Sequence, residues 1–140
     1  MQQRRTIARF ARMDEILTTS DIVSLHLPLT DRSHHTIGAA ELAAMKPGAF
    51  LVNTGRGGLV DETALIAALR GGRLSGAALD VFAQEPVELD NPLLQMHNVV
   101  ALPHIGGRTE DNLSRMVNHW AANIRAFDEG RGIDTACLVT

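Results

Sequence analysis

The sequence has little of the residues and patterns that mark several specialised classes of protein. Its only cysteine is Cys137, so no internal disulfide can form, and the cytoplasm is the expected compartment. The net charge of -3 gives no basic surface, which argues against nucleic acid or a membrane as a partner. No apolar run approaches the length that spans a bilayer, and no secretory signal pattern occurs. The adjacent His34 and His35 have no cysteine or acidic residue at ligand spacing, so no metal site is predicted.

What the sequence does contain is an ordinary globular composition in which strands and helices alternate. Hydrophobic residues make up 45% and charged residues 21% of the 140 residues, which allows one domain with a core. Strands are expected at Asp21–Pro28, Ala49–Val52, Leu74–Leu79 and Asn98–Leu102. Helices are expected at Met13–Thr19, with Ile16 and Leu17 facing inward, and at Gly38–Met45, Glu62–Arg70 and Arg108–Glu129. The alternation predicts an α/β fold with a parallel sheet and right-handed crossovers.

The stretch Val52–Gly58 is a Gly-rich turn between an apolar run and a helix start. The run Ala49–Val52 is short and bounded by glycines, as a buried parallel strand would be, and Asp61 is expected to cap the following helix. Arg56 therefore falls just past the C-terminal end of a strand, where ligands bind in open α/β sheets. Its planar guanidinium suits a carboxylate. On this stretch alone, an arginine that only solvates the loop is an equally good interpretation.

Polar residues follow three successive predicted strands, namely Arg56, then Asp80 and Glu85, then His104. All of them fall at the same edge of the predicted sheet. Histidine serves as an acid or a base near neutral pH, and Glu85 can fix its tautomer while Arg56 holds a carboxylate beside it. Solvation of a loop explains each residue taken alone. Their order at one edge favours a catalytic site.

The predicted helix Arg108–Glu129 carries a broad apolar stripe at helical spacing. Its members are Leu113, Met116, Val117, Trp120, Ala121, Ile124 and Phe127. We interpret this stripe first as core and second as part of a subunit interface, which would make the protein a homodimer.

Several long motifs in order make the chain resemble the D-isomer-specific 2-hydroxyacid dehydrogenases, which include phosphoglycerate dehydrogenase and glyoxylate/hydroxypyruvate reductase. The matching stretches are Ser20–Thr30, Met45–Gly57, Asp80–Pro86 and Pro103–Gly107. The resemblance covers about residues 14–130 and implies that they form the C-terminal part of an NAD-binding domain. Residues 1–13 are then a poorly defined N-terminal segment and 131–140 a tail.

The resemblance implies an oxidoreductase that transfers a hydride between a nicotinamide cofactor, NAD or NADP, and a D-2-hydroxy acid or 2-oxo acid. It implies that Arg56 binds the substrate carboxylate, that His104 exchanges the proton and that Glu85 supports His104.

The resemblance also places the cofactor cleft. The residues that it implies there are Leu27, Pro28, Thr54, Asp80 and Gly106, with Asp80 near the nicotinamide.

The sequence departs from that family at the phosphate-binding turn. No G-x-G-x-x-G pattern occurs in it, so the expected fold is a partial Rossmann-type doubly wound parallel sheet, the second half only, with a long C-terminal helix. Two hypotheses follow. The chain is a fragment of an enzyme, weakly active or inactive alone, or it is a non-catalytic truncated Rossmann-like module that acts by association. The three matching residues Arg56, Glu85 and His104 favour the first.

Overall fold

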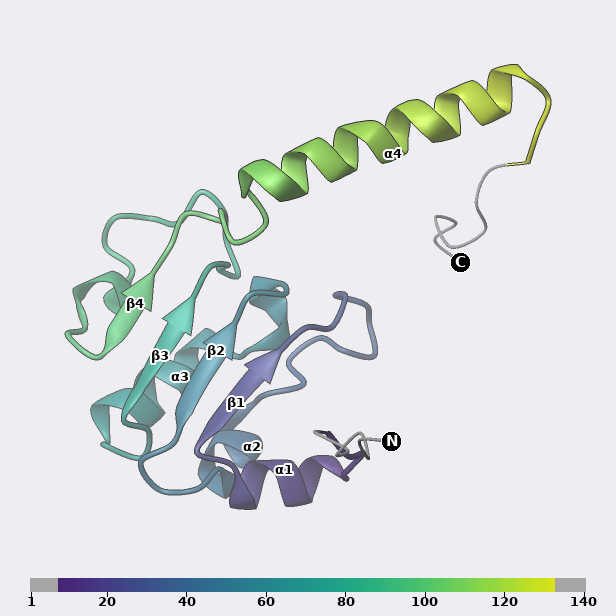
Figure 1. Ribbon diagram of the computed structural model, residues 1–140. Coiled ribbons are helices and arrows are strands. Elements are labelled where there is room, and N and C mark those ends of the chain that lie inside the picture. The colour runs from purple at the N-terminus through teal and green to yellow at the C-terminus, as the bar shows by residue number, and fades with distance from the viewer. Residues whose placement is uncertain (1–7, 133–140) are drawn as a thin grey trace, which may run out of the picture. The chain divides into compact units, whose positions relative to one another are not determined.

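The computed structural model describes residues 8–132, and the chain divides into two compact units, Met1–His104 and Ile105–Thr140. The first unit holds a small sheet with its helices (Figure 1). Its elements in chain order are α1 (Met13–Thr19), β1 (Ile22–Leu25), α2 (Ala39–Ala44), β2 (Phe50–Asn53), the short 3-10 helix η1 (Gly57–Leu59), α3 (Glu62–Arg70), β3 (Gly76–Leu79), a second 3-10 helix η2 (Pro92–Gln95) and β4 (Val99–Ala101). The second unit holds α4 (Glu110–Asp128). Among the described residues no helix is long and apolar enough to cross a membrane.

The sheet is parallel, with the strands in the order β1-β2-β3-β4, as the alternation predicted (Figure 1). Its register aligns Leu25 with Asn53, Asn53 with Leu79, and Leu79 with Ala101. The strands therefore stop together, and the loops that follow them leave from one edge. The sequence pattern predicted that Arg56, Asp80, Glu85 and His104 lie at this edge.

The strands are shorter than predicted. The expected strand Asp21–Pro28 ends as β1 at Leu25, and the expected Leu74–Leu79 begins as β3 only at Gly76. The physical reason is the register, because a strand runs only as far as its neighbour offers backbone partners. The helix Glu62–Arg70 is confirmed at both ends, and its predicted cap is confirmed because the Asp61 carboxylate accepts from the Ala64 amide at 3.1 Å.

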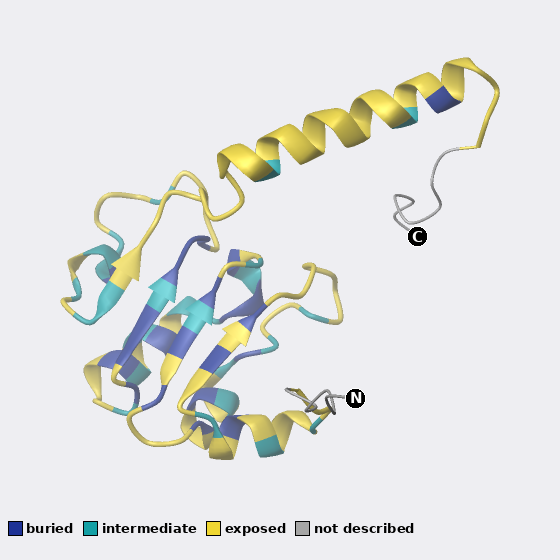
Figure 2. Ribbon diagram, viewed as in Figure 1, coloured by how far each residue is buried: buried dark blue, intermediate teal, exposed yellow. Residues whose placement is uncertain are grey.

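One face of the sheet is buried and the other is largely open. Along β1 and β2, Figure 2 shows dark blue alternating with lighter colours, and α3 lies behind these strands (Figure 1). Leu51 points into the core with no exposed area, while its neighbour Phe50 is 47% exposed. The expectation of a buried strand at Ala49–Val52 therefore holds for Ala49 and Leu51 but not for Phe50, because among the described residues of this unit the crossover helices cover one face.

Two predictions about apolar helix faces also need correction. In α1, Leu17 is buried as expected, but Ile16 is 39% exposed. In α4, the apolar stripe is not core, since Trp120 is 55% and Phe127 75% exposed. Among residues 105–132 α4 is the one helix, so its own unit offers no second element to close over the stripe.

Candidate active site

A cavity of about 460 Å³ lies at the carboxyl edge of the sheet, and Asp80, Glu85 and His104 line it together with Phe82, Pro86 and Leu102. These residues come from the loop after β3 and from the segment after β4. The sequence predicted that Arg56, Asp80, Glu85 and His104 would lie together at this edge. The structure brings Asp80, Glu85 and His104 to one cavity, and Arg56 is not among the residues that line it. No cluster of side chains able to hold a metal ion occurs among residues 8–132.

Glu85 and His104 form a hydrogen-bonded pair. The His104 Nδ1 lies 2.8 Å from Glu85 Oε2, and the other oxygen, Oε1, accepts from the Phe82 amide at 3.0 Å. Because an ionised carboxylate only accepts hydrogen bonds, His104 carries its proton on Nδ1 in this pair. The second ring nitrogen, Nε2, is then the one available for acid–base chemistry with a bound molecule.

The His104 backbone is held in an unusual conformation. Its φ of 55° lies in the left-handed region, which is uncommon for a residue other than glycine. Its amide donates to the Asp80 carbonyl at 2.9 Å, which ties the segment after β4 to the residue after β3. Residues in this conformation persist only where the surrounding contacts hold them, and they are common at functional sites.

The electrostatics of the pair keep Glu85 ionised. The hydrogen bond from His104 is the largest cause that lowers the pKa of Glu85 below its usual range. Burial opposes this change, whereas the Phe82 amide and the positive charges of His104 and Arg56 add to it. Glu85 is therefore an anion at neutral pH, which fixes the tautomer of His104.

Arg56 lies on the loop between β2 and η1, with an extended backbone (φ -144°, ψ 143°) and an exposed side chain. Its Nη1 donates to the Gly55 carbonyl at 2.7 Å. Its positive charge is the smallest of the causes that lower the pKa of Glu85. The geometry therefore brings Glu85 and His104 into direct contact, whereas Arg56 lies on the loop after β2 and does not contact either of them among the hydrogen bonds described.

The residues predicted to line a cofactor cleft fall into two groups. Leu27, Pro28 and Thr54 lie on the loops after β1 and β2, and a Cβ on Gly55 would stand 3.1 Å from the Leu27 carbonyl, so these loops adjoin. The Thr54 hydroxyl lies 3.5 Å from Nδ1 of His26. Asp80, 3% exposed, lines the cavity described above.

Gly106 belongs to the second unit. It lies in a turn in which the Arg108 amide donates to the Ile105 carbonyl at 2.8 Å, and it is described with that unit alone.

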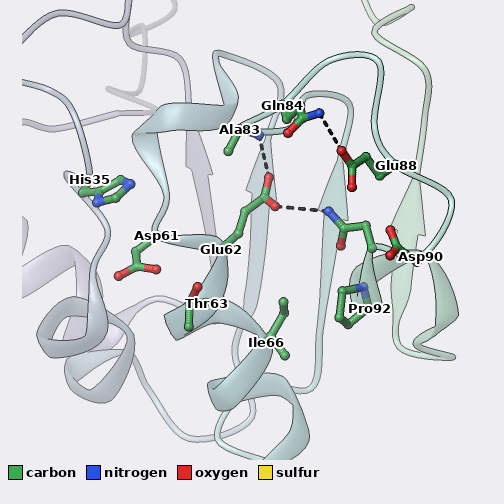
Figure 3. A pocket seen from close by; sticks show the side chains of 11 residues that line it. His35, Asp61, Glu62, Thr63, Ile66, Ala83, Gln84, Glu88, Asp90 and Pro92 are labelled. Carbon is green, nitrogen blue, oxygen red and sulfur yellow. Dashed lines mark hydrogen bonds between the residues drawn. The ribbon is translucent and has the colours of Figure 1, made fainter.

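A second cavity, of about 490 Å³, lies between the start of α3 and the loop that carries Glu85 (Figure 3). There the Glu62 carboxylate accepts from the Ala83 amide at 2.6 Å and from Nδ2 of Asn91 at 3.2 Å (Figure 3). Glu62 thus anchors the loop that carries Glu85 through the Ala83 amide. Sequence reasoning missed this role, because the only local signal is its place in the first turn of a helix.

Gly57 is a second contact that the sequence did not reveal. A Cβ built on it would stand 1.9 Å from the backbone carbon and oxygen of Phe82. Only glycine allows the loop that follows Arg56 to press so closely on the loop that leads to Glu85. The two loops are therefore fixed against each other by backbone contact.

Comparisons with known proteins agree with this geometry. Residues 1–106 match the family model "D-isomer specific 2-hydroxyacid dehydrogenase, NAD binding domain". The chain is 54% identical over 109 residues to glyoxylate/hydroxypyruvate reductase B of Shigella boydii, a match that covers 78% of this chain and 34% of that relative. The match to the same enzyme of Citrobacter koseri is 52% over 114 residues, covering 81% of this chain and 35% of the relative. The chain thus spans about a third of the length of these curated relatives.

Solved structures give the same result for the fold. The TT0316 protein of Thermus thermophilus superposes with a TM-score of 0.85 and 42% identity, covering 93% of this chain and 42% of that one. A D-lactate dehydrogenase of Lactobacillus jensenii, solved with NAD+, has a TM-score of 0.80 and 32% identity, covering 88% and 41%. The predicted partial Rossmann-type α/β fold is confirmed. The chain belongs to the D-isomer specific 2-hydroxyacid dehydrogenase family and contains part of its NAD-binding domain.

Proposed function

We propose that this chain carries the catalytic edge of an oxidoreductase that transfers a hydride between NAD or NADP and a D-2-hydroxy acid or 2-oxo acid. The observation that carries the proposal is the Glu85–His104 hydrogen bond, with Arg56 on the adjoining loop. A histidine with one nitrogen fixed by a carboxylate, with an exposed guanidinium on the adjoining loop, suits a substrate that needs both a proton and a charge partner.

In the reducing direction, protonated His104 gives its Nε2 proton to the carbonyl oxygen of the 2-oxo acid. Glu85 stabilises the imidazolium through Nδ1 before this transfer and fixes the neutral ring afterwards. Arg56 binds the substrate carboxylate, which orients the carbonyl toward His104. The nicotinamide, when bound, supplies the hydride that reaches the carbonyl carbon.

The described residues fit the nicotinamide end of the cofactor better than its phosphates. Asp80 places a buried carboxyl group in the wall of the cavity beside the Glu85–His104 pair, at the strand edge where dinucleotides bind in such sheets. Leu27, Pro28, Thr54 and Gly106 are proposed as further cofactor contacts. The sequence holds no G-x-G-x-x-G turn for a pyrophosphate, so we expect cofactor binding by this chain to be weak.

The test is to titrate the purified chain with NADH and NADPH, and then to follow NADH oxidation with glyoxylate and hydroxypyruvate, the substrates that the relatives' name gives. His104→Ala should abolish turnover and leave cofactor affinity unchanged, because it removes the proton donor alone. A folded chain that binds neither cofactor and turns over neither acid would refute the proposal for this chain.

A second candidate is a module that acts by association, and the exposed stripe of α4 favours it. Leu113, Val117, Trp120, Ile124 and Phe127 follow the alternating spacing of four and three residues by which helices pair. A homodimer through this stripe is the form that we propose. Sedimentation velocity of the wild type against Trp120→Glu tests it, and a wild type that stays monomeric would contradict it. The cytoplasmic location expected from the sequence stays a prediction.

A further inference from the structure

Asn53 ends β2 and stands directly before the loop that carries Arg56. It is 1% exposed. Among the described residues, Asp80 is the only other polar residue that is buried. The Nδ2 of Asn53 donates to the Arg56 carbonyl at 2.9 Å, and its Oδ1 accepts from the Gly55 amide at 3.1 Å. A buried carboxamide is costly unless both of its ends are paired, and here Gly55 and Arg56 pair both.

These bonds fix Arg56 relative to the rest of the site. The Arg56 carbonyl that Asn53 binds also accepts from the Leu59 amide at 3.2 Å, so the backbone of Arg56 is held from two sides. The carbonyl of Asn53 accepts from the Asp80 amide at 3.0 Å, and the Asp80 carbonyl accepts from the His104 amide. Asn53 thus joins the backbone that carries the guanidinium to the backbone that carries the imidazole.

We propose that Asn53 is a positioning residue whose buried carboxamide sets Arg56 at the place where its guanidinium meets the carboxylate of a 2-oxo acid beside His104. This role rests on the proposed function, because that function gives Arg56 a carboxylate to bind. Among side chains of this size only a carboxamide offers a donor and an acceptor on two separate atoms. An aspartate here keeps the acceptor for Gly55 but turns an oxygen toward the Arg56 carbonyl.

The kinetic test uses the full 140-residue chain with Asn53→Asp and, as matched control, Asn98→Asp. Asn98 is half-buried in the turn before β4, at the opposite edge of the sheet. Asn53→Asp should raise the KM for glyoxylate about tenfold, the value of one lost hydrogen bond, and change kcat less. The KM for NADH should not change, and Asn98→Asp should leave all three constants as they are.

A double variant separates positioning from a general structural defect. If Asn53 acts through Arg56, adding Asn53→Asp to Arg56→Lys raises the KM for glyoxylate by less than about twofold, since the guanidinium to be placed is already gone. A structural defect would multiply the two effects instead. Multiplied effects would overturn the proposed role of Asn53.

Amide hydrogen exchange gives a readout that needs no activity. The Gly55 amide should exchange slowly in the wild type and about tenfold faster in Asn53→Ala, whereas Asn98→Ala should leave it unchanged. Fast exchange at Gly55 in the folded wild type would overturn the role of Asn53 whether or not the variant folds. A wild type without turnover would leave exchange at Gly55 and Leu59 to decide the role of Asn53, and a wild type that in addition binds neither NADH nor NADPH would refute the proposed function.

Discussion

Gly57→Ala is the substitution for which the structure gives the sharpest expectation. The new Cβ would stand 1.9 Å from the Phe82 backbone carbon and oxygen and 2.4 Å from the Ala83 nitrogen. Ordinary contact begins at 3.4 Å, so the two loops must separate by 1.5 Å. Both sides of this contact are backbone, and no side-chain rotation relieves it. Overpacking of this kind costs about 1–3 kcal/mol of stability.

The same shift should disturb the site, because the Phe82 amide that holds Glu85 would move. A displacement of about 1 Å in a catalytic group lowers the rate roughly a hundredfold, so kcat should fall by that order. Thermal unfolding checks the stability part, with an expected loss of about 3–10 °C in Tm for a chain of this length.

Gly58→Ala is the control for this prediction. Its Cβ would meet the methyl ends of Leu29 at 3.0 and 3.2 Å, and that flexible side chain can turn away. Its Tm and kcat should therefore stay near those of the wild type. If Gly57→Ala melts with the wild type and turns over as fast, the two loops are not fixed against each other, and the reasoning from backbone contact is wrong.

Three further predictions follow from the contacts of the site. Arg56→Lys should raise the KM for glyoxylate more than it lowers kcat, because a point charge replaces a two-pronged donor, and an unchanged KM would argue against carboxylate binding there. Glu85→Gln should be less stable than the wild type at neutral pH. Contacts in the folded state lower the pKa of Glu85, so ionised Glu85 stabilises the fold above its ordinary pKa of 4.5, and this stabilisation is lost as pH falls through the lowered pKa. Urea unfolding from neutral to acid pH should therefore show the stabilities of the two proteins converging. Glu62→Ala should lower kcat several-fold and speed amide exchange at Ala83, while Glu62→Gln, which keeps an acceptor for Ala83, should retain most of the rate; equal rates in all three proteins would remove Glu62 from the support of the catalytic loop.

The order of strands and the edge on which the site lies could be predicted because both depend on local patterns. Alternation of apolar runs and helical stripes gave the parallel sheet, and the position of Arg56, Glu85 and His104 after successive strands gave the shared edge. Strand ends could not be predicted in this way. His26 looks like strand from its neighbours, yet β1 stops at Leu25 because β2, its partner in the ladder, stops at Asn53.

The exposed apolar face of α4 shows a second limit of prediction from sequence. The periodicity of Val117, Trp120 and Ile124 identifies an apolar face, but it says nothing of what covers that face. The prediction of core assumed that other elements of the same unit would pack against this face. Among the described residues of that unit, no second helix or strand does so. Periodicity and exposure together are therefore needed before such a stripe is assigned to core or interface.

The side chains that hold the site were missed for a different reason. In the sequence, Asn53 is a polar residue that follows an apolar run, Glu62 is a charge in a first helical turn and Gly57 is one glycine of several. Their roles depend on partners that only the fold supplies, since Glu62 binds the amide of Ala83 across 21 positions of sequence. Catalytic groups can be recognised by their chemistry, whereas positioning groups are recognised by what they touch.

The described contacts that hold Arg56, Glu85 and His104 lie within the first unit. Asn53 and Gly57 fix the loop of Arg56, the Phe82 amide holds Glu85, and the Asp80 carbonyl holds the His104 amide. These contacts come from residues 53–104, which lie within the described part of this chain. We therefore expect the Glu85–His104 hydrogen bond to form in this chain even where cofactor binding is weak. Formation of the Glu85–His104 pair depends on strand register, whereas affinity for the nucleotide depends on a phosphate-binding turn. The two properties are therefore separable in this fold.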